Sequence, residues 1–105
     1  MTDTLKMVHE EAGGRGGFYL RDVDGRTLGS ITYYHDQPGT VVFDHTDVDE
    51  SLRGQGRARQ LLDAGVEWVR AEHLHITPEC PYVKGQFRKD PSLADVLTPG
   101  ASIEE

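Results

Sequence analysis

Residues 48–62 have the composition of an anion-binding turn followed by a helix. Gly54 and Gly56 lie at the turn, where a missing Cβ lets the backbone adopt positive φ and approach a ligand closely. The helix that follows directs its free N–H groups and the positive end of its dipole toward the turn. Three arginines add positive charge in this segment, namely Arg53, Arg57 and Arg59. The pattern predicts a cradle for a phosphate or pyrophosphate group.

The single cysteine, Cys80, is a candidate nucleophile. Pro81 suits the first position of a helix, where a missing N–H has no consequence, so Cys80 is expected at the helix N-cap. The free N–H groups and the dipole of that helix favour a thiolate. The alternative is a small, partly buried cap residue without chemistry. An intramolecular disulfide is excluded because the chain has no second cysteine.

A metal centre is not predicted. His73, His75 and Cys80 offer mixed ligand types, but their spacing matches no common zinc pattern.

Composition limits the classes of protein to which the chain can belong. Its 105 residues are expected to form a single domain, 1–105. The formal net charge of -7 argues against duplex nucleic acid as the main partner. No apolar run approaches the ~20 residues that a membrane span requires, and the N-terminus does not resemble a signal peptide. We therefore expect a soluble, cytoplasmic protein with no nucleic-acid or membrane partner.

The elements that would position these residues change period midway along the chain. Alternating apolar residues predict strands over 6–11, 17–21, 27–34 and 40–48, joined as an antiparallel meander. In the last of these, Val41, Phe43, His45 and Asp47 are expected to share one face. The glycine-rich run 13–17 lacks the ending of a phosphate loop and is expected to be a hairpin connection.

Spacings of three and four between apolar residues predict a helix from the turn to about Glu72, with its apolar stripe against the sheet. A short strand at 74–77 is expected to lie parallel to the strand 40–48. Shorter helical segments follow at about 81–89 and 92–97, and the tail after Gly100 is expected to fray. The fold class is therefore α+β, with a mixed, mainly antiparallel sheet of about five strands and one or two short C-terminal helices.

Three motifs resemble those of the GNAT superfamily of acyl-CoA-dependent N-acetyltransferases, and in particular of its small single-domain branch. They are His-Thr-x-Val before the turn, the pyrophosphate motif Gln/Arg-x-x-Gly-x-Gly/Ala at the turn, and Pro-x-Cys-x-Tyr-Val after the helix. Here they read His45-Thr46-Asp47-Val48, Arg53-Gly54-Gln55-Gly56-Arg57-Ala58 and Pro78-Glu79-Cys80-Pro81-Tyr82-Val83. The order of strands and helices agrees with the superfamily as well.

The resemblance implies that acetyl-CoA is the co-substrate. Backbone N–H groups from Gly54 through Gln55 and Gly56 to Ala58 would hold the CoA pyrophosphate, with Arg53 and Arg57 adding positive charge. Val48 would pair its backbone with the pantetheine amides. The alternative for the arginines is ordinary solvation on the helix surface.

The resemblance also implies catalytic roles. Cys80 would lie near the CoA sulfur and could take the acetyl group first, whereas ordinary GNAT enzymes transfer it directly to an amine. Tyr82 would donate a proton to the departing CoA thiolate; its alternative is an amphipathic residue at the sheet edge. His45 titrates near neutrality and is the first candidate for the base, with Asp44 and Glu50 behind it. A structural role is the alternative for His45.

These features predict an acetyl-CoA-dependent N-acetyltransferase that acts on a small-molecule or peptide amine, as a monomer or homodimer. The acidic surface would suit a cationic acceptor. Full-length GNAT enzymes usually add a C-terminal strand pair that helps to enclose the acceptor, and this chain departs from them after Leu97. That departure motivates the rival prediction, a CoA-binding or protein-interaction module without turnover.

Overall fold

Four antiparallel strands fill the first half of the chain in the computed structural model, which describes residues 4–104. β1 (Lys6–Ala12), β2 (Arg15–Arg21), β3 (Thr27–His35) and β4 (Thr40–Val48) pair in sequence order. Gly13 and Gly14 form the first turn with positive φ of 62° and 80°. The glycine-rich run is therefore a hairpin connection, as expected.

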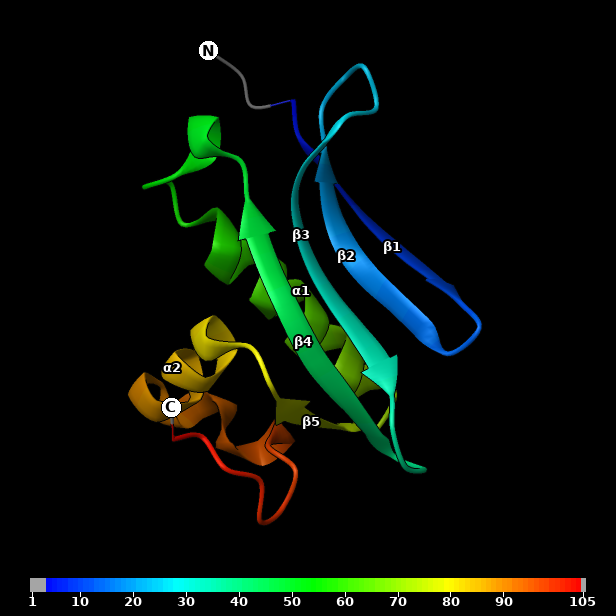
Figure 1. Cartoon of the computed structure of the whole chain (residues 1–105), viewed down its shortest axis with the longest axis vertical. Helices are drawn as coiled ribbons and strands as arrows, with labels where there is room; N and C mark the ends of the chain where they lie inside the picture. The colour runs from blue at the N-terminus through cyan, green and yellow to red at the C-terminus, as the bar shows by residue number, and fades with distance from the viewer. Residues whose placement is uncertain (1–3, 105) are drawn as a thin grey trace.

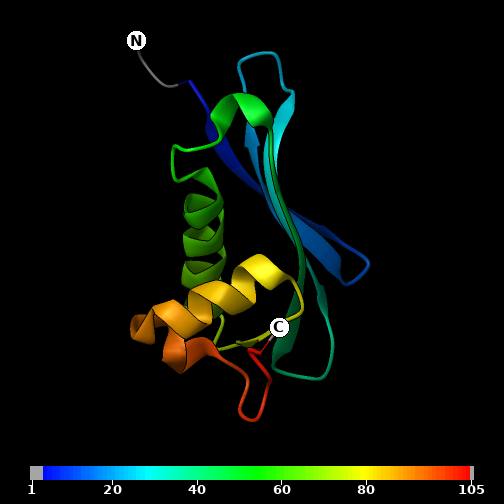
Figure 2. The ribbon, with the colours of Figure 1, turned by 60° about the vertical axis from the view of Figure 1, so that its left-hand side comes forward.

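A helical crossover then returns the chain to the sheet (Figure 1). The turn η1 (Glu50–Leu52) leads into α1 (Arg57–Ala71), and β5 (His75–Pro78) pairs parallel with β4 at the sheet edge. Two helical segments, α2 (Pro81–Lys89) and η2 (Pro91–Val96), follow. Figure 2 shows the helices on one side of the sheet and the other side uncovered. The predicted α+β fold, with a mixed five-stranded sheet within residues 4–104, is confirmed.

The core lies between the helices and the covered face of the sheet. On α1 the fully buried residues Leu61, Leu62 and Val69 recur at helical spacing, as the apolar stripe predicts. They pack against strand residues such as Phe18 and Phe43 in one cluster. The same cluster takes in buried residues of α2 and η2, namely Val83, Phe87, Leu93 and Val96. The C-terminal segments are therefore fixed to the same core as the sheet.

Gly65 allows α1 to approach the sheet closely. A Cβ at this position would lie 2.8 Å from Cε2 of Phe43, a ring that is itself fully buried. We expect Gly65→Ala to lower the free energy of unfolding by ~2 kcal/mol, because overpacking outweighs the better helix propensity of alanine. Urea unfolding of the two proteins measures the difference.

Gly85 offers a matched control for that substitution. It lies inside α2, where a Cβ would meet only the end of the Arg88 side chain, at 3.6 Å. Gly85→Ala is expected to leave the stability unchanged or raise it by up to ~1 kcal/mol. Equal effects of the two substitutions would contradict the packing explanation.

A β-bulge in β4 changes which residues face the helices. Thr32 is opposite His45 but Tyr33 is opposite Phe43, so Asp44 is the additional residue. Phe43 is fully buried before the bulge, whereas Val48 packs against the core after it, and His45 and Asp47 are exposed. The expectation that His45 and Asp47 share a face with Phe43 is therefore wrong.

A cluster of hydrogen-bonded and ring-packed side chains joins β1 and β3 to α1. The Tyr33 hydroxyl donates to Oε1 of Glu11 at 2.7 Å, so its oxygen is left to accept from Nε2 of His9, also at 2.7 Å. His35 contacts the same Glu11 oxygen at 3.0 Å. The His9 ring stacks on the Phe18 ring, with centroids 4.1 Å apart. It also makes a T-shaped contact with the Trp68 ring, with centroids 4.9 Å apart.

This cluster predicts a loss of stability in mild acid. His9 is exposed, but the rings packed against it partly desolvate its imidazole and lower its pKa below the ordinary 6.5, and the nearby Glu11 carboxylate only partly opposes this. The unfolded chain therefore binds more protons below pH 6.5, so the contribution of His9 is present above that pH and is lost as the pH falls. We expect urea unfolding to show a larger decrease between about pH 7 and about pH 5 for the wild type than for His9→Gln. Equal decreases would contradict this role of His9.

The C-terminal tail is held more firmly than expected. Leu97 forms a parallel bridge with Ile76 of β5, and the Thr98 amide donates to the Ile76 carbonyl at 2.8 Å. Ile103 packs against the core and its carbonyl accepts a hydrogen bond from Arg88. The expectation of a frayed tail after Gly100 is therefore wrong at Ile103.

Among residues 4–104, no helix has both the length and the apolar character needed to cross a membrane.

Candidate functional site

The two parallel strands at the sheet edge separate partway along β4 (Figure 1). β5 pairs with β4 only from Thr40 to Phe43. The Phe43 carbonyl then accepts from the amides of both Glu79 and Cys80, at 2.9 and 3.2 Å, and the chain turns into α2. Beyond this point no described strand pairs with residues 44–48 of β4 on the β5 side. This length of strand edge is open to an extended ligand.

The predicted anion cradle lies beside the end of that open edge. Gly54 and Gly56 have positive φ of 82° and 74°, and a Cβ at either would meet nothing within 4 Å. Gly56 is the N-cap of α1, and no side chain caps the helix. The first amides of α1 have no acceptor within the helix, so they face the turn with the positive end of the dipole.

One continuous groove connects the cradle with the open edge of β4. A hollow of about 240 Å³ is lined by Gly54, Gly56 and their neighbours, and a second of about 280 Å³ is lined by Thr46 and Asp47. The two hollows share four lining residues, namely Val48, Arg53, Ala58 and Tyr82. Every residue of the predicted cofactor set except Gln55 lines this groove. An elongated ligand with an anionic end fits its shape and its polarity.

Cys80 lies where the strands separate. Its backbone is extended (φ -76°, ψ 133°) and it is the N-cap of α2, as Pro81 predicts. Its side chain makes no cap hydrogen bond. The thiol instead contacts the hydroxyl of Thr46 on β4, with Sγ 3.4 Å from Oγ1. The sulfur is therefore directed toward the open edge of β4 rather than toward the amides of its own helix.

A sequence model of the GCN5-related N-acetyl-transferase family matches residues 17–96. The chain belongs to this family. The match spans β2 to η2 and so includes the groove, the cradle and Cys80.

Solved structures of other GNAT proteins share the fold. A GCN5-like candidate N-acetyltransferase from Staphylococcus aureus is 31% identical and has a TM-score of 0.71; the alignment covers 92% of this chain and 91% of that one. A GNAT protein from Escherichia coli, solved in complex with CoA, is 25% identical with a TM-score of 0.54 over 60% of this chain and 38% of its own. A GNAT acetyltransferase from Elizabethkingia anophelis with acetyl-CoA bound is 13% identical, with a TM-score of 0.60 over 73% of this chain and 65% of its own, and shows likeness of fold alone. No curated protein sequence matches significantly.

The three arginines around the predicted anion cradle have different hydrogen-bond partners. Arg53 lines the groove and its Nε donates to the Val48 carbonyl at 3.3 Å. The contacts of Arg57 include hydrogen bonds to the side chains of Gln55 and Gln60, at 3.4 and 2.9 Å. Both guanidinium groups are thereby held at the rim of the cradle.

Arg59 instead joins the two helices that flank the groove. It bonds Asp63 on α1 at 2.8 Å and Asp90 after α2 at 2.5 Å, with a further bond to Gln86 at 2.9 Å. Hydrogen bonds from Ser92, and then from Arg59, lower the pKa of Asp90 to about 2, so the pair stays ionised at neutral pH. The Arg59 guanidinium is therefore paired with carboxylates of the protein itself, and these bonds fix the position of α2 relative to α1.

Of the predicted catalytic residues, Tyr82 lines the groove, and Cys80 lies buried beside it in contact with the lining residue Thr46, whereas His45 is not part of the groove. Tyr82 is half-buried in the groove wall, and burial raises its pKa, so its phenol keeps its proton at neutral pH. His45 lies opposite Thr32 and is exposed on the uncovered face, on the other side of the sheet from the helices. The β-bulge at Asp44 produces this separation.

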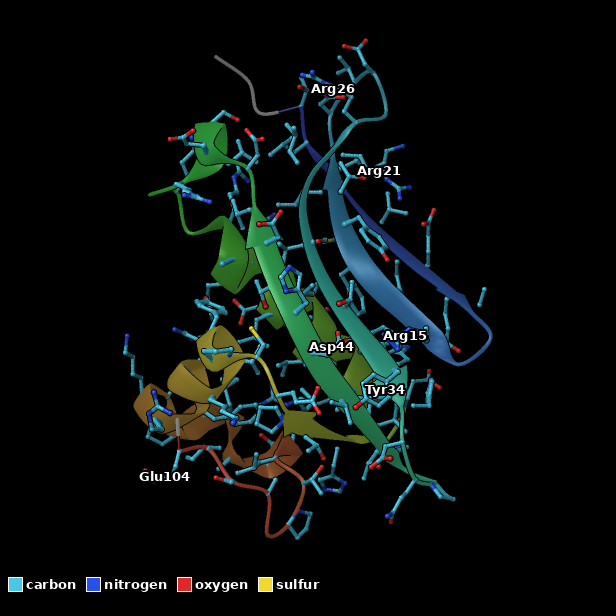
Figure 3. The ribbon with its side chains drawn as sticks, in the orientation of Figure 1. Arg15, Arg21, Arg26, Tyr34, Asp44 and Glu104 are labelled. Carbon is cyan, nitrogen blue, oxygen red and sulfur yellow. The ribbon has the colours of Figure 1, made fainter. Side chains whose placement is uncertain are left out.

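A polar network on the uncovered face involves Asp44 (Figure 3). The Asp44 carboxylate accepts from the Thr32 hydroxyl at 2.6 Å and from Arg15 at 3.2 Å. The Arg15 guanidinium lies over the Tyr34 ring, 5.1 Å from its centroid, and the Tyr34 hydroxyl donates to Glu79 at 3.3 Å. Asp44 therefore has a cationic partner already, while Glu50 lies in η1, beyond the end of β4.

Within residues 4–104, no group of three or more His, Cys, Asp or Glu side chains is arranged to hold a metal ion.

Proposed function

We propose that this GNAT protein binds acetyl-CoA along the groove and transfers the acetyl group to an amine. The observation that carries the proposal is the open edge of β4 running into an uncapped helix N-terminus. The edge offers backbone hydrogen bonds to the amide-bearing arm of CoA, and the first amides of α1 suit its pyrophosphate. The CoA and acetyl-CoA complexes of the structural neighbours support the same choice of ligand.

Bound in this orientation, the thioester end of acetyl-CoA would reach the point where β4 and β5 separate. Cys80 lies at that point, and Tyr82 lies in the adjoining wall. The Cys80 sulfur would attack the acetyl carbonyl and receive the acetyl group as the bond to the CoA sulfur breaks. Tyr82 would give its proton to the departing CoA sulfur and be reprotonated by the proton that Cys80 loses. The amine would then attack the acetyl-cysteine, take the acetyl group and release the Cys80 sulfur. In the direct route the amine itself attacks the carbonyl, and Cys80 has no chemical role.

The acceptor would approach from the uncovered face of the sheet. His45 is exposed there, and an imidazole is a side chain of the kind that takes a proton from an ammonium group. A lysine-bearing peptide or a polyamine would match the formal net charge of -7. Because this face carries no enclosing layer, a module that binds CoA without turnover is the second candidate.

The deciding experiment measures CoA binding and turnover side by side. Calorimetric titration with CoA measures the first, and release of free thiol from acetyl-CoA across a panel of amines measures the second. We expect saturable binding together with amine-dependent thiol release. Binding without release on any amine would favour the module, and no binding would contradict both candidates.

A further inference from the structure

Thr46 is a residue of the His-Thr motif to which the proposed transfer reaction assigns no role. It follows the bulge in β4, which turns its side chain, and not that of His45, toward the helices. It is half-buried in the wall of the groove. Its hydroxyl oxygen is the hydrogen-bond partner of the Cys80 thiol, at 3.4 Å.

The contact crosses the place where the two strands separate. Cys80 is 6% exposed and belongs to the buried core cluster, yet its thiol is not used to cap α2. Thr46 lies on the part of β4 that β5 does not pair. The hydrogen bond therefore fixes the sulfur at the open strand edge, which is where the groove ends.

A hydroxyl can serve both charge states of a cysteine. Toward the thiol, the Thr46 oxygen accepts the S–H proton, which is the arrangement present here. Toward the thiolate, the same hydroxyl can rotate and donate its O–H to the sulfur. A hydrogen bond to a charged acceptor is stronger than one to a neutral acceptor, so the contact favours the thiolate.

We propose that Thr46 is a positioning residue that orients the Cys80 sulfur at the open edge of β4 and stabilises its thiolate. This inference rests on the covalent route of the proposed function. In that route a bond forms between Sγ and the acetyl carbon as the bond between that carbon and the CoA sulfur breaks. The proton released by Cys80 ends on the CoA sulfur, so the exchange balances without a further reactant.

Two substitutions separate the hydroxyl from the shape of the side chain. Thr46→Val keeps the β-branched shape that suits a strand and removes the hydroxyl, whereas Thr46→Ser keeps the hydroxyl. The readout is the rate at which iodoacetamide alkylates Cys80 in the protein without CoA, followed by mass spectrometry. Cys80 is the only cysteine of the chain, so the signal comes from one site.

At about pH 7 we expect Thr46→Val to react about tenfold more slowly than the wild type and Thr46→Ser to react at a similar rate to the wild type. The difference should shrink as the pH is raised, because the thiolate fraction then increases in every variant. Circular dichroism verifies the fold, and Thr46→Ala replaces the valine variant if that one does not fold.

Alkylation of the hydroxyl-free variant at the wild-type rate would overturn the proposal, as would equal slowing in the valine and serine variants. The result is independent of acetyl transfer. If Thr46→Val slows alkylation but acetyl-CoA leaves no adduct on wild-type Cys80, the positioning of the thiol stands and the covalent route of the proposed function fails.

Discussion

Gly56→Glu is expected to abolish CoA binding while leaving the sheet and its core intact. Gly56 caps α1 in the left-handed region, at φ 74°, and faces open space. Glutamate there would place a carboxylate and its side-chain bulk beside the first amides of α1, where the proposed ligand places its own phosphates. We expect the calorimetric affinity for CoA to fall at least a hundredfold, equivalent to about 2.7 kcal/mol or more.

Two further variants distinguish loss of the site from backbone strain. Gly56→Ala meets the same unfavourable φ without the charge, and we expect only a modest loss of affinity. Gly25→Glu introduces the same side chain at a positive φ of 82°, in the turn between β2 and β3, at a residue that does not line the groove. It should lose stability without losing affinity. Wild-type affinity in folded Gly56→Glu would remove the cradle from the proposed function.

The glycine turn and the helix start of the predicted cradle could be expected from the sequence because their signals are local. A glycine in the left-handed region, an uncapped helix start and an apolar stripe from Leu61 to Val69 all lie within a few turns of chain. The strands of the meander were predictable for the same reason, since alternation and turn residues are short-range patterns. The parallel pairing of β5 followed from the length of the helical crossover.

The bulge at Asp44 could not be predicted from local sequence patterns. Its position depends on how β4 pairs with β3, and neither Asp44 nor its neighbours carry the glycine that would mark such an irregularity. Alternation alone therefore assigns His45 to the wrong face of the sheet. A one-residue shift in a strand exchanges the two faces, so a single bulge decides which side chain of the His-Thr motif can reach Cys80.

The direction of the Cys80 thiol was also outside the reach of local reasoning. Pro81 correctly predicts that Cys80 is the N-cap, but it does not predict whether the Cys80 side chain bonds to its own helix or to a distant residue. Thr46 lies 34 residues earlier in the chain. Likewise, one of the three arginines of the predicted cradle, Arg59, forms an ion pair with Asp90, which lies 31 residues later in the chain. Local patterns do not predict such a contact.

Cys80→Ala is expected to remove the acetyl adduct and to reduce turnover at least about a hundredfold if the covalent route operates, because the residue would be the nucleophile itself. Mass spectrometry after incubation with acetyl-CoA should show one acetyl group on the wild type and none on the variant. The affinity for CoA should persist, because the substitution leaves the cradle and the open edge of β4 unchanged. The substitution truncates a buried side chain, so the expected loss of stability is ~1 kcal/mol.

Cys80→Ser provides the matched control, because it retains the size and the hydrogen bond to Thr46 while replacing the thiol with a much weaker nucleophile. Under the covalent route, Cys80→Ser should turn over nearly as slowly as Cys80→Ala although it preserves the packing. Under direct transfer, both variants should keep the wild-type rate with any amine that supports thiol release. The amine would then attack the thioester itself from the uncovered face, where His45 is exposed and Cys80 is not.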